Sequence, residues 1–469
     1  MGIARSSLKL FIARATTTVI SFIGITYFAR ELGASQMGVF FLFQTVLGFL
    51  GIPAGFGIQG GVEKRISEGK NPDSVFATSL LMLIISISVI SAIILIFQDY
   101  LNSYIGGEVA MYIMIGLFLQ QMGKLMLKVL NGELRVGDTA IIRFSKKLTW
   151  VGAGAVFVLL GFDYYGLVYG VLFGSAMTFI FAWYRKSIPL GKPSIKSARS
   201  IFDYSKYSFI SSIGGYFYSW MDVAILGIFL SQSHIGAYEM AWRVTTIVML
   251  LSSSIATSIF PHVSKWDSKD SYKKIENILP EAMTPALLLS IPAFFGTVVL
   301  SKEILGLVFG EEYTIAWIAL IILMGEKLLQ SVHIILGRSL QAINRPDLAA
   351  KSGIIAIIIN LVLNIFFIWE FGLVGAAVAT AVSFIVNSIL HAHYLSQFIK
   401  IRFETKKILW SLASALIMTG VLIPIKLIYG VNNVIQLGMV ISLGVIVYSI
   451  VLFLSSRIRT DAINMAQNL

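Results

Sequence analysis

The chain has 469 residues, of which 57% are apolar and only 13% are charged, and its formal net charge is +12 at pH 7. Its mean hydropathy of +0.83 lies far above the value that a soluble protein of this length can carry. The composition therefore excludes a soluble multi-domain enzyme and predicts an integral protein of the cell membrane.

Apolar windows long enough to cross a hydrocarbon core of about 30 Å recur from residue 8 almost to the end of the chain. They predict an all-α polytopic protein with about 14 transmembrane helices. The first six predicted spans are about 8–31, 36–58, 76–97, 107–131, 139–160 and 165–184. The next six are about 203–230, 234–260, 282–300, 313–337, 350–370 and 372–396, and the last two are about 407–427 and 432–455.

The basic residues alternate between connections, as the positive-inside rule requires. One set of connections holds clusters such as Lys64 to Lys70, Lys124 to Lys147 and Arg185 to Lys206, whereas "QDYLNSYIGGE" and "GFDYYG" hold none. By this count about 30 of the 36 basic residues are cytoplasmic. We expect an even number of helices with both termini in the cytoplasm, and the positive charge indicates no nucleic-acid partner.

The sequence contains an internal repeat with an offset of about 200 residues. "FARELGASQMGVFFLFQTV" aligns with "LGIFLSQSHIGAYEMAWRV", so that Gly38 matches Gly236, and "YGLVYGVLFGSA" from Tyr165 aligns with "FGLVGAAVATAV" from Phe371. The repeat predicts two six-helix lobes in residues 1–190 and 191–400, followed by two further helices and a cytoplasmic tail in 401–469. Parallel repeats of this kind favour alternating-access transport, with the substrate between the lobes.

Small residues spaced four apart on one helix face allow close helix packing. They occur at Gly166, Gly170 and Gly174 in one lobe and at Gly375 and Ala379 in the other.

Two prolines inside predicted spans indicate bent or broken helices. Pro53 lies in "GFLGIPAGFGIQGG", and Pro292 lies well inside the span 282–300. Such positions serve either ordinary kinking or a hinge between the lobes.

Catalytic patterns are absent from the sequence, which has no cysteine, no phosphate-binding loop and no metal-protease motif. His391 and His393, near a helix end, are expected to be solvated or structural rather than metal ligands. We therefore expect no enzyme activity, no cofactor and no bound metal. Without an ATP motor, uphill transport requires an ion gradient, the membrane potential or consumption of the substrate on the far side.

Ionisable residues at membrane depth are the informative ones, because each costs about 2.5 to 3.5 kcal/mol at a helix centre. The candidates for a cavity are Arg14, Arg30, Asp222, Glu239, Arg243 and Lys327, and the candidates for ion coupling are Asp222, Glu239 and Glu326. His333 follows Glu326 and Lys327 in the same predicted span.

Each candidate has a structural alternative. Arg14 could extend to the cytoplasmic surface, and Arg30 could lie at the outer interface. Asp222 could serve either a cavity or an interhelical contact, and Glu239 and Arg243, one turn apart, could pair only with each other.

Three stretches of the chain are informative about its family: "DVAILGIFLSQSHIGAYEMAWR", "NRPDLAAKSGIIAIIINLVLNIFFIWEFGLVGAAVATAVSF" and "FARELGASQMGVFF". They resemble the polysaccharide transporter family, the lipid-linked oligosaccharide flippases of the multidrug, oligosaccharidyl-lipid and polysaccharide exporter superfamily, and the resemblance extends over essentially the whole chain. "SSIGGYFYSWMDVAI" and "VEKRISEG" are most similar to archaeal members that act on dolichol-linked glycans in N-glycosylation.

This resemblance implies two six-helix lobes around a hydrated cavity, two helices that form a lipid-facing groove, and transfer of a polyprenyl- or dolichyl-linked sugar to the outer leaflet. It assigns the carrier phosphate or pyrophosphate to Arg14, Arg243 and Lys327, with Arg30 at the outer mouth. Glycosyltransferases and an oligosaccharyltransferase of the same pathway are the expected protein partners.

A cation-coupled drug antiporter of the same superfamily is the alternative, because the fold is shared and Asp222 and Glu239 could bind a cation. The basic residues in the first helix favour an anionic substrate instead. A membrane-bound glycan polymerase would require a larger outer loop, and a channel or scaffold is disfavoured by the duplicated halves.

Overall fold

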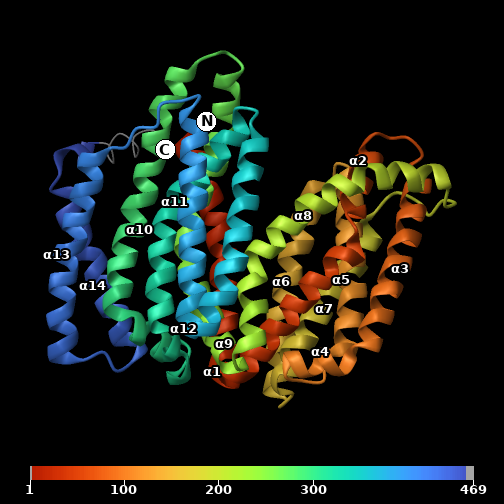
Figure 1. Ribbon diagram of the computed structural model, residues 1–469, viewed down its shortest axis with the longest axis horizontal. Helices are drawn as coiled ribbons and strands as arrows, with labels where there is room; N and C mark the ends of the chain where they lie inside the picture. Colours follow the sequence, from red (N-terminus) through yellow and green to blue (C-terminus); the bar gives the residue numbers. More distant parts are fainter. Residues whose placement is uncertain (1–2, 461–469) are drawn as a thin grey trace. The chain divides into compact units, whose positions relative to one another are not determined.

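The computed structural model describes the backbone of residues 3–460 and the side chains of 18–460, apart from 206–208, 210–215 and 218–219. Within residues 3–460 the chain is helical and forms no strand, as predicted (Figure 1). The helices are α1 (Ile3–Gly55), α2 (Ile58–Ser67), α3 (Pro72–Ile96), α4 (Gln98–Ile105), α5 (Ala110–Gly132), α6 (Val136–Leu159), α7 (Asp163–Arg185), α8 (Ile195–Phe229), α9 (Gln232–Asp267), α10 (Tyr272–Val308), the 3-10 helix η1 (Glu311–Ala316), α11 (Trp317–Ala342), α12 (Pro346–Ser396), α13 (Thr405–Tyr429) and α14 (Val434–Phe453).

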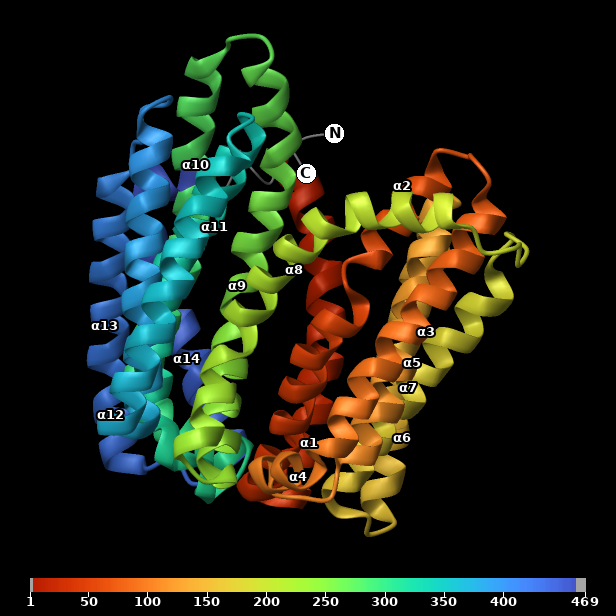
Figure 2. The same ribbon diagram turned by 45° about the vertical axis from the view of Figure 1, so that its right-hand side comes forward.

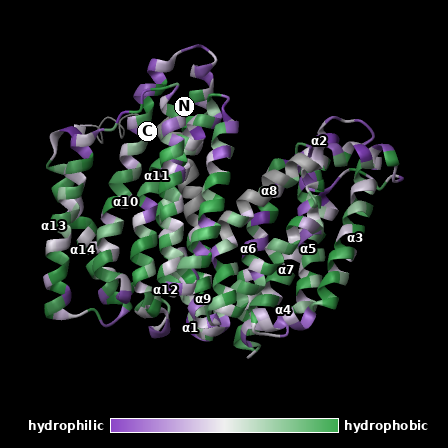
Figure 3. Cartoon of the chain, in the orientation of Figure 1, coloured by the Kyte–Doolittle hydropathy of each residue, from purple (hydrophilic) through white to green (hydrophobic). Residues whose placement is uncertain are grey.

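Ten helices in the described part of the chain are long and apolar enough to cross a membrane, which confirms a multi-pass membrane protein. Figure 3 shows apolar residues along most of their length. The helices α1 and α12, with 53 and 51 residues, would each extend over more than 75 Å if straight, at about 1.5 Å per residue. Each is interrupted instead by a glycine at positive φ, Gly33 or Gly372. The count of fourteen spans and the cytoplasmic termini remain predictions.

The chain divides into two compact units, which we call the N-terminal unit (Tyr27–Gly236) and the C-terminal unit (Met1–Thr26 with Ala237–Leu469). The repeat places its boundaries elsewhere, at residues 190 and 400, and the division into lobes remains a prediction.

In the N-terminal unit the predicted glycine face does pack closely. A Cβ atom on Gly170 would lie 2.7 Å from the carbonyl oxygen of Trp150, and one on Gly166 would lie 2.8 Å from the backbone nitrogen of Val158. Helix α7 therefore rests directly on the backbone of α6. Figure 2 shows α5, α6 and α7 side by side, with α8 beside α2.

The C-terminal unit has two apolar cores. One joins α9, α10, α11 and α12 around Val263, Leu279 and Leu340. The other joins α10 to α13 and α14 around Leu300, Met418 and Leu437. Helix α10 thus holds the last two helices to the rest of the unit. It stays helical through Pro292, where the sequence predicted a bent or broken helix.

A reciprocal contact supports the internal repeat. A Cβ atom on Gly38 would lie 1.8 Å from the carbonyl oxygen of Gln232, and a Cβ atom on Gly236 would lie 2.1 Å from that of Ala34. The repeat offset of 198 residues carries Ala34 to Gln232 and Gly38 to Gly236. Each of the two contacts therefore becomes the other when every residue is replaced by its counterpart in the other repeat. Duplicated segments related by a pseudo-two-fold axis produce this exchange, and all four residues lie in the N-terminal unit.

Candidate functional site

The two arginines predicted in the first helix both belong to α1. Arg14 lies outside the described side chains. Arg30 lies shortly before the break at Gly33, and its side chain is exposed. Exposure beside a helix break agrees with the interfacial alternative for Arg30.

Asp222 lies on α8 in the N-terminal unit. It is half-buried between Met221 and Val223, whose side chains are buried. A role in a cavity or in a contact between helices remains a prediction.

Glu239 and Arg243 form the predicted ion pair on α9. Arg243 Nη2 lies 3.4 Å from Glu239 Oε2, and the side chains are 28% and 6% exposed, respectively. The Glu239 carboxylate is buried, whereas the Arg243 guanidinium remains accessible. Arg243 can therefore contact an anion while it stays on the helix surface.

Glu326 and Lys327 are neighbours on α11, where adjacent side chains point about 100° apart. Their long side chains nevertheless meet, with Lys327 Nζ 2.6 Å from Glu326 Oε2, and both are fully buried. The Lys327 ammonium also lies 3.9 Å from the ring centre of Trp242 and 5.8 Å from that of Phe384. Lys327 is therefore enclosed by its own unit, and a ligand could reach it only after rearrangement of these aromatic rings.

In the N-terminal unit, the predicted break after Pro53 is confirmed. Helix α1 ends at Gly55 and α2 begins at Ile58, with positive φ at Phe56 (41°) and Gly57 (67°) between them. A Cβ atom on Gly57 would lie 2.3 Å from the carbonyl oxygen of Ser205, so α8 approaches the break too closely for a larger residue.

Polar side chains donate hydrogen bonds to the backbone carbonyls around this break. Gln121 donates to the carbonyl of Gly51 at 2.8 Å and accepts from Gln59 at 2.6 Å, while Ser86 donates to the carbonyl of Pro53 at 3.1 Å. Broken helices whose ends are satisfied by polar side chains are typical of transporter binding sites.

Lys124 lies on α5, on the same helix as Gln121. Its ammonium donates to Gln120 Oε1 at 3.1 Å and to the Tyr216 hydroxyl at 3.0 Å. Both acceptors are neutral, and among the described residues no carboxylate lies within ion-pair distance of Lys124. No described carboxylate therefore neutralises Lys124, which lies three residues from Gln121 at the helix break.

The sequence missed this residue as a candidate. The alternation of basic residues counts Lys124 in a cytoplasmic cluster that ends at Lys147, although the predicted span 107–131 already includes it, and the structure keeps it in the apolar helix α5. The four-residue spacing of Gln120, Lys124 and Lys128 was the available signal, because it puts the three side chains on one helix face.

Side chains of the stretch "VEKRISEG" (residues 62–69) connect α2 to α5 and α8. Glu63 pairs with Lys128 of α5, and Arg65 contacts the Ser200 carbonyl of α8 at 3.4 Å. Arg65 also donates to both carboxylate oxygens of Glu68, at 3.1 and 2.9 Å, and these hydrogen bonds lower the pKa of Glu68. The motif thus has a structural role at the end of the broken helix.

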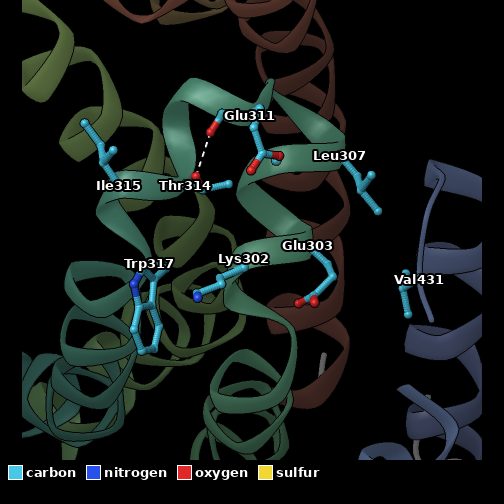
Figure 4. Close-up of a pocket in the computed structure, with 9 residues that line it drawn as sticks. Lys302, Glu303, Leu307, Glu311, Thr314, Ile315, Trp317 and Val431 are labelled. Atoms are coloured by element: carbon cyan, nitrogen blue, oxygen red, sulfur yellow. Dashed lines mark hydrogen bonds between the residues drawn. The ribbon is translucent and has the colours of Figure 1, made fainter. Parts of the chain in front are cut away.

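A separate pocket of about 450 Å³ lies in the C-terminal unit, where α10, η1 and α11 meet Val431 (Figure 4). Lys302 lies 4.8 Å from the Trp317 ring centre, and Glu303 pairs with Lys426 at 2.8 Å. Acids and bases both line the pocket, and this mixture gives it no clear preference for an anion.

The comparisons with known proteins agree with one another. A family model described as "Polysaccharide biosynthesis protein" matches residues 27–317. A Haloferax volcanii protein named "Probable low-salt glycan biosynthesis flippase Agl15" is 54% identical over 462 residues, which cover 98% of each chain. A second protein of that organism, "Probable flippase AglR", is 29% identical and covers 97% of each chain.

Solved structures show the same fold. The lipid II flippase MurJ in an inward closed conformation superposes with a TM-score of 0.79 at 18% identity, over 96% of this chain and 99% of MurJ. An inward-facing multidrug transporter of the MATE family gives 0.66 at 18% identity, over 84% of this chain and 98% of that one. The MurJ and MATE transporter fold is therefore the fold of this chain.

Proposed function

This chain belongs to the polysaccharide biosynthesis protein family, and we propose that it acts there as a flippase for lipid-linked glycans. It moves a sugar or oligosaccharide on polyprenyl or dolichyl phosphate from the cytoplasmic to the outer leaflet by alternating access. The product would enter surface glycan assembly or protein N-glycosylation. The chain is a membrane transporter and not an enzyme.

The observation that carries the proposal is the near full-length relation to the Haloferax volcanii protein that is named as a glycan biosynthesis flippase. A relation over the whole chain includes both units and the last two helices, so it supports a shared transport cycle as well as a shared scaffold.

The charges of the chain fit an anionic headgroup. An unpaired phosphate in hydrocarbon is prohibitively costly, and guanidinium and ammonium groups are its natural partners. Arg243 is the accessible member of its ion pair, and Lys124 carries an unneutralised charge beside a broken helix. We propose Arg243 of the C-terminal unit and, independently of it, Lys124 of the N-terminal unit as phosphate contacts, with Arg14 and Arg30 as further candidates.

Lys327 is not among the phosphate contacts in this proposal, because it is fully buried against Glu326 and Trp242. Asp222, Glu239 and Glu326 stay the candidates for ion coupling. Glycosyltransferases and an oligosaccharyltransferase are the proposed partners, since they would make the substrate and consume the product.

The test uses the purified full chain in vesicles that contain a radiolabelled dolichyl phosphate-linked hexose. Enzymatic access to the sugar from outside measures its transfer between leaflets. We expect Arg243→Ala to slow transfer about 10- to 150-fold, the equivalent of the 1.5 to 3 kcal/mol of a charged hydrogen bond. Arg243→Lys should retain part of the rate, because it keeps the charge.

Normal transfer by folded Arg243→Ala would remove Arg243 from the substrate site. Absence of transfer by the wild-type chain, together with efflux of a cationic dye against a proton or sodium gradient, would support the antiporter alternative instead.

A further inference from the structure

The pocket of about 450 Å³ in the C-terminal unit contains an acceptor that has no donor in the described part of the protein (Figure 4). Glu303 uses Oε1 for its ion pair with Lys426, whereas its Oε2 is buried and has no hydrogen-bond partner among the described residues. A buried acceptor without a donor requires an explanation, and a ligand in the pocket would supply that donor. The volume suits a small molecule, since ligand pockets measure about 300 to 1,000 Å³.

Glu311 adds a second carboxylate to the lining of the pocket. Its side chain is exposed and forms neither an ion pair nor a hydrogen bond with the described residues, while its backbone carbonyl accepts from the Thr314 hydroxyl at 2.6 Å. A Cβ atom on Gly306 would lie 3.1 Å from Glu311 Oε2, so this carboxylate rests directly on the α10 backbone. Two carboxylates with open oxygens therefore line one small space.

Lys302 and Trp317 complete the polar lining. Lys302 Nζ lies 4.8 Å from the Trp317 ring centre, and Figure 4 shows its side chain extending toward that ring. An ammonium group has three donors, and contact with an aromatic face does not use all of them. Lys302 is exposed, so it can donate to a ligand while it stays beside Trp317.

The charges around the pocket cancel, and this balance selects the ligand. The two carboxylates are matched by the ammonium groups of Lys302 and Lys426. An anion would meet both acids and a metal ion would meet both ammonium groups, so neither ion is favoured. A neutral ligand rich in hydroxyl groups fits instead, because hydroxyls donate to carboxylates and accept from ammonium. Ile315 and Trp317 offer apolar surface to the C–H face of a sugar ring.

We propose that this pocket binds a sugar unit at the outer face of the membrane. Basic clusters lie before α10, at Lys265 to Lys274, and after α11, at Arg338 to Lys351, so the connection between these helices belongs to the outer set. The connection between α13 and α14, which contains Val431, belongs to the same set by the same alternation. The sugar has two sources: the glycan of the transported lipid, or the headgroup of a glycolipid in the outer leaflet. Only the first source rests on the proposed function.

The first experiment needs no lipid-linked substrate. Saturation-transfer NMR of the full chain in nanodiscs detects binding of methyl α-mannoside and methyl α-glucoside, which are uncharged hexosides. We expect a signal from at least one of them, and Glu311→Ala should weaken its binding about tenfold or more, because a hydrogen bond to a charged group is lost. Glu312→Ala is the matched control, since Glu312 is the neighbouring exposed carboxylate and does not line the pocket.

Thermal unfolding shows whether both variants are folded. Absence of hexoside binding by the wild type, or equal binding by folded Glu311→Ala and Glu312→Ala, would overturn the proposal. Displacement of the hexoside by phosphoethanolamine would also overturn it, because the pocket would then prefer a zwitterionic headgroup.

The second experiment distinguishes the two sources of the sugar. Ile315→p-benzoylphenylalanine places a photo-crosslinker at an exposed position in the lining. The full chain is placed in vesicles with radiolabelled dolichyl phosphate-linked hexose or with a radiolabelled hexosyl glycolipid, and labelled dolichyl phosphate without a sugar is the control. Capture of the dolichyl-linked hexose supports a site for the transported glycan, and capture of the glycolipid alone supports a site for a resident lipid.

Capture of neither lipid, or equal capture of the sugar-free control, would overturn the proposal. Absence of transfer between leaflets by the wild type would instead refute the proposed function, while hexoside binding in the first experiment would still decide whether the sugar site exists.

Discussion

Three cations of the two units, Arg243, Lys327 and Lys124, differ in the partners that surround them. In the C-terminal unit, Arg243 and Lys327 each have a carboxylate, at 3.4 and 2.6 Å. Lys124 of the N-terminal unit contacts the neutral oxygens of Gln120 and Tyr216 and, among the described residues, no carboxylate. A cation on neutral acceptors offers all of its charge to an anionic ligand, whereas an acid-paired cation shares its charge with the carboxylate. An anion can therefore bind Lys124 without competing with an acid, whereas an anion on Arg243 shares that guanidinium with Glu239.

The largest expected effect is on the buried pair of the C-terminal unit. Glu326→Gln leaves the Lys327 ammonium buried without its carboxylate, so we expect a loss of about 3 to 5 kcal/mol in the free energy of unfolding. Thermal unfolding of the purified chain in detergent measures this loss. The double change Glu326→Leu with Lys327→Met removes both charges and should recover most of the stability. Equal stability of the single and double variants would mean that the pair is not buried as an ion pair.

The next effect concerns function in the N-terminal unit. Lys124→Met removes an unneutralised charge and should slow transfer of the lipid-linked hexose about 10- to 150-fold, with little change in thermal stability. Lys128→Met on the same face is the matched control, because Lys128 is already paired with Glu63. If both variants slowed transfer equally, the carboxylate partner of Lys128 would make no difference to transfer, and Lys124 would have no special role.

A smaller effect is expected at the helix break itself. Gln121→Leu leaves the Gly51 carbonyl without its side-chain donor and should cost about 1 to 3 kcal/mol of stability. Gln59→Leu leaves that hydrogen bond intact, and we expect it to cost less. Thermal unfolding of both variants ranks them, and the reverse order would show that Gln59 rather than Gln121 supports the break.

The smallest effect is expected at Glu68, which lies on the surface. The hydrogen bonds from Arg65 lower the pKa of Glu68 in the folded chain, so this ion pair stabilises the fold above the unfolded pKa. The contribution disappears as the pH falls through the lowered pKa. The melting temperature of Glu68→Gln should therefore lie slightly below that of the wild type at pH 7, and the two should coincide in acid. A difference that grew in acid would contradict this sign.

Much of the fold follows from hydropathy and from special residues. The apolar windows predict the membrane helices, the four-residue glycine spacing predicts the approach of α7 to α6, and Pro53 among glycines predicts the break between α1 and α2. These features depend on backbone geometry and on local sequence, so they can be read before the chain is folded.

The candidate site was only partly predictable. The Glu239 and Arg243 pair follows from their spacing of one helical turn. Lys124 was counted with a cytoplasmic cluster although it lies inside the predicted span 107–131, because the positive-inside rule counts charges without locating their partners. Lys327 was expected in a cavity, but Trp242 of another helix encloses it.

The sequence by itself determined that this chain is a polytopic membrane protein, because hydrophobic length is a property of the linear chain, and its repeat period predicts duplicated halves. Only the tertiary structure decided which side chains surround each charge. The contacts of Tyr216 with Lys124 and of Trp242 with Lys327 both join different helices. The free energy of a buried charge depends on such partners, and partners distant in sequence are brought together only by helix packing.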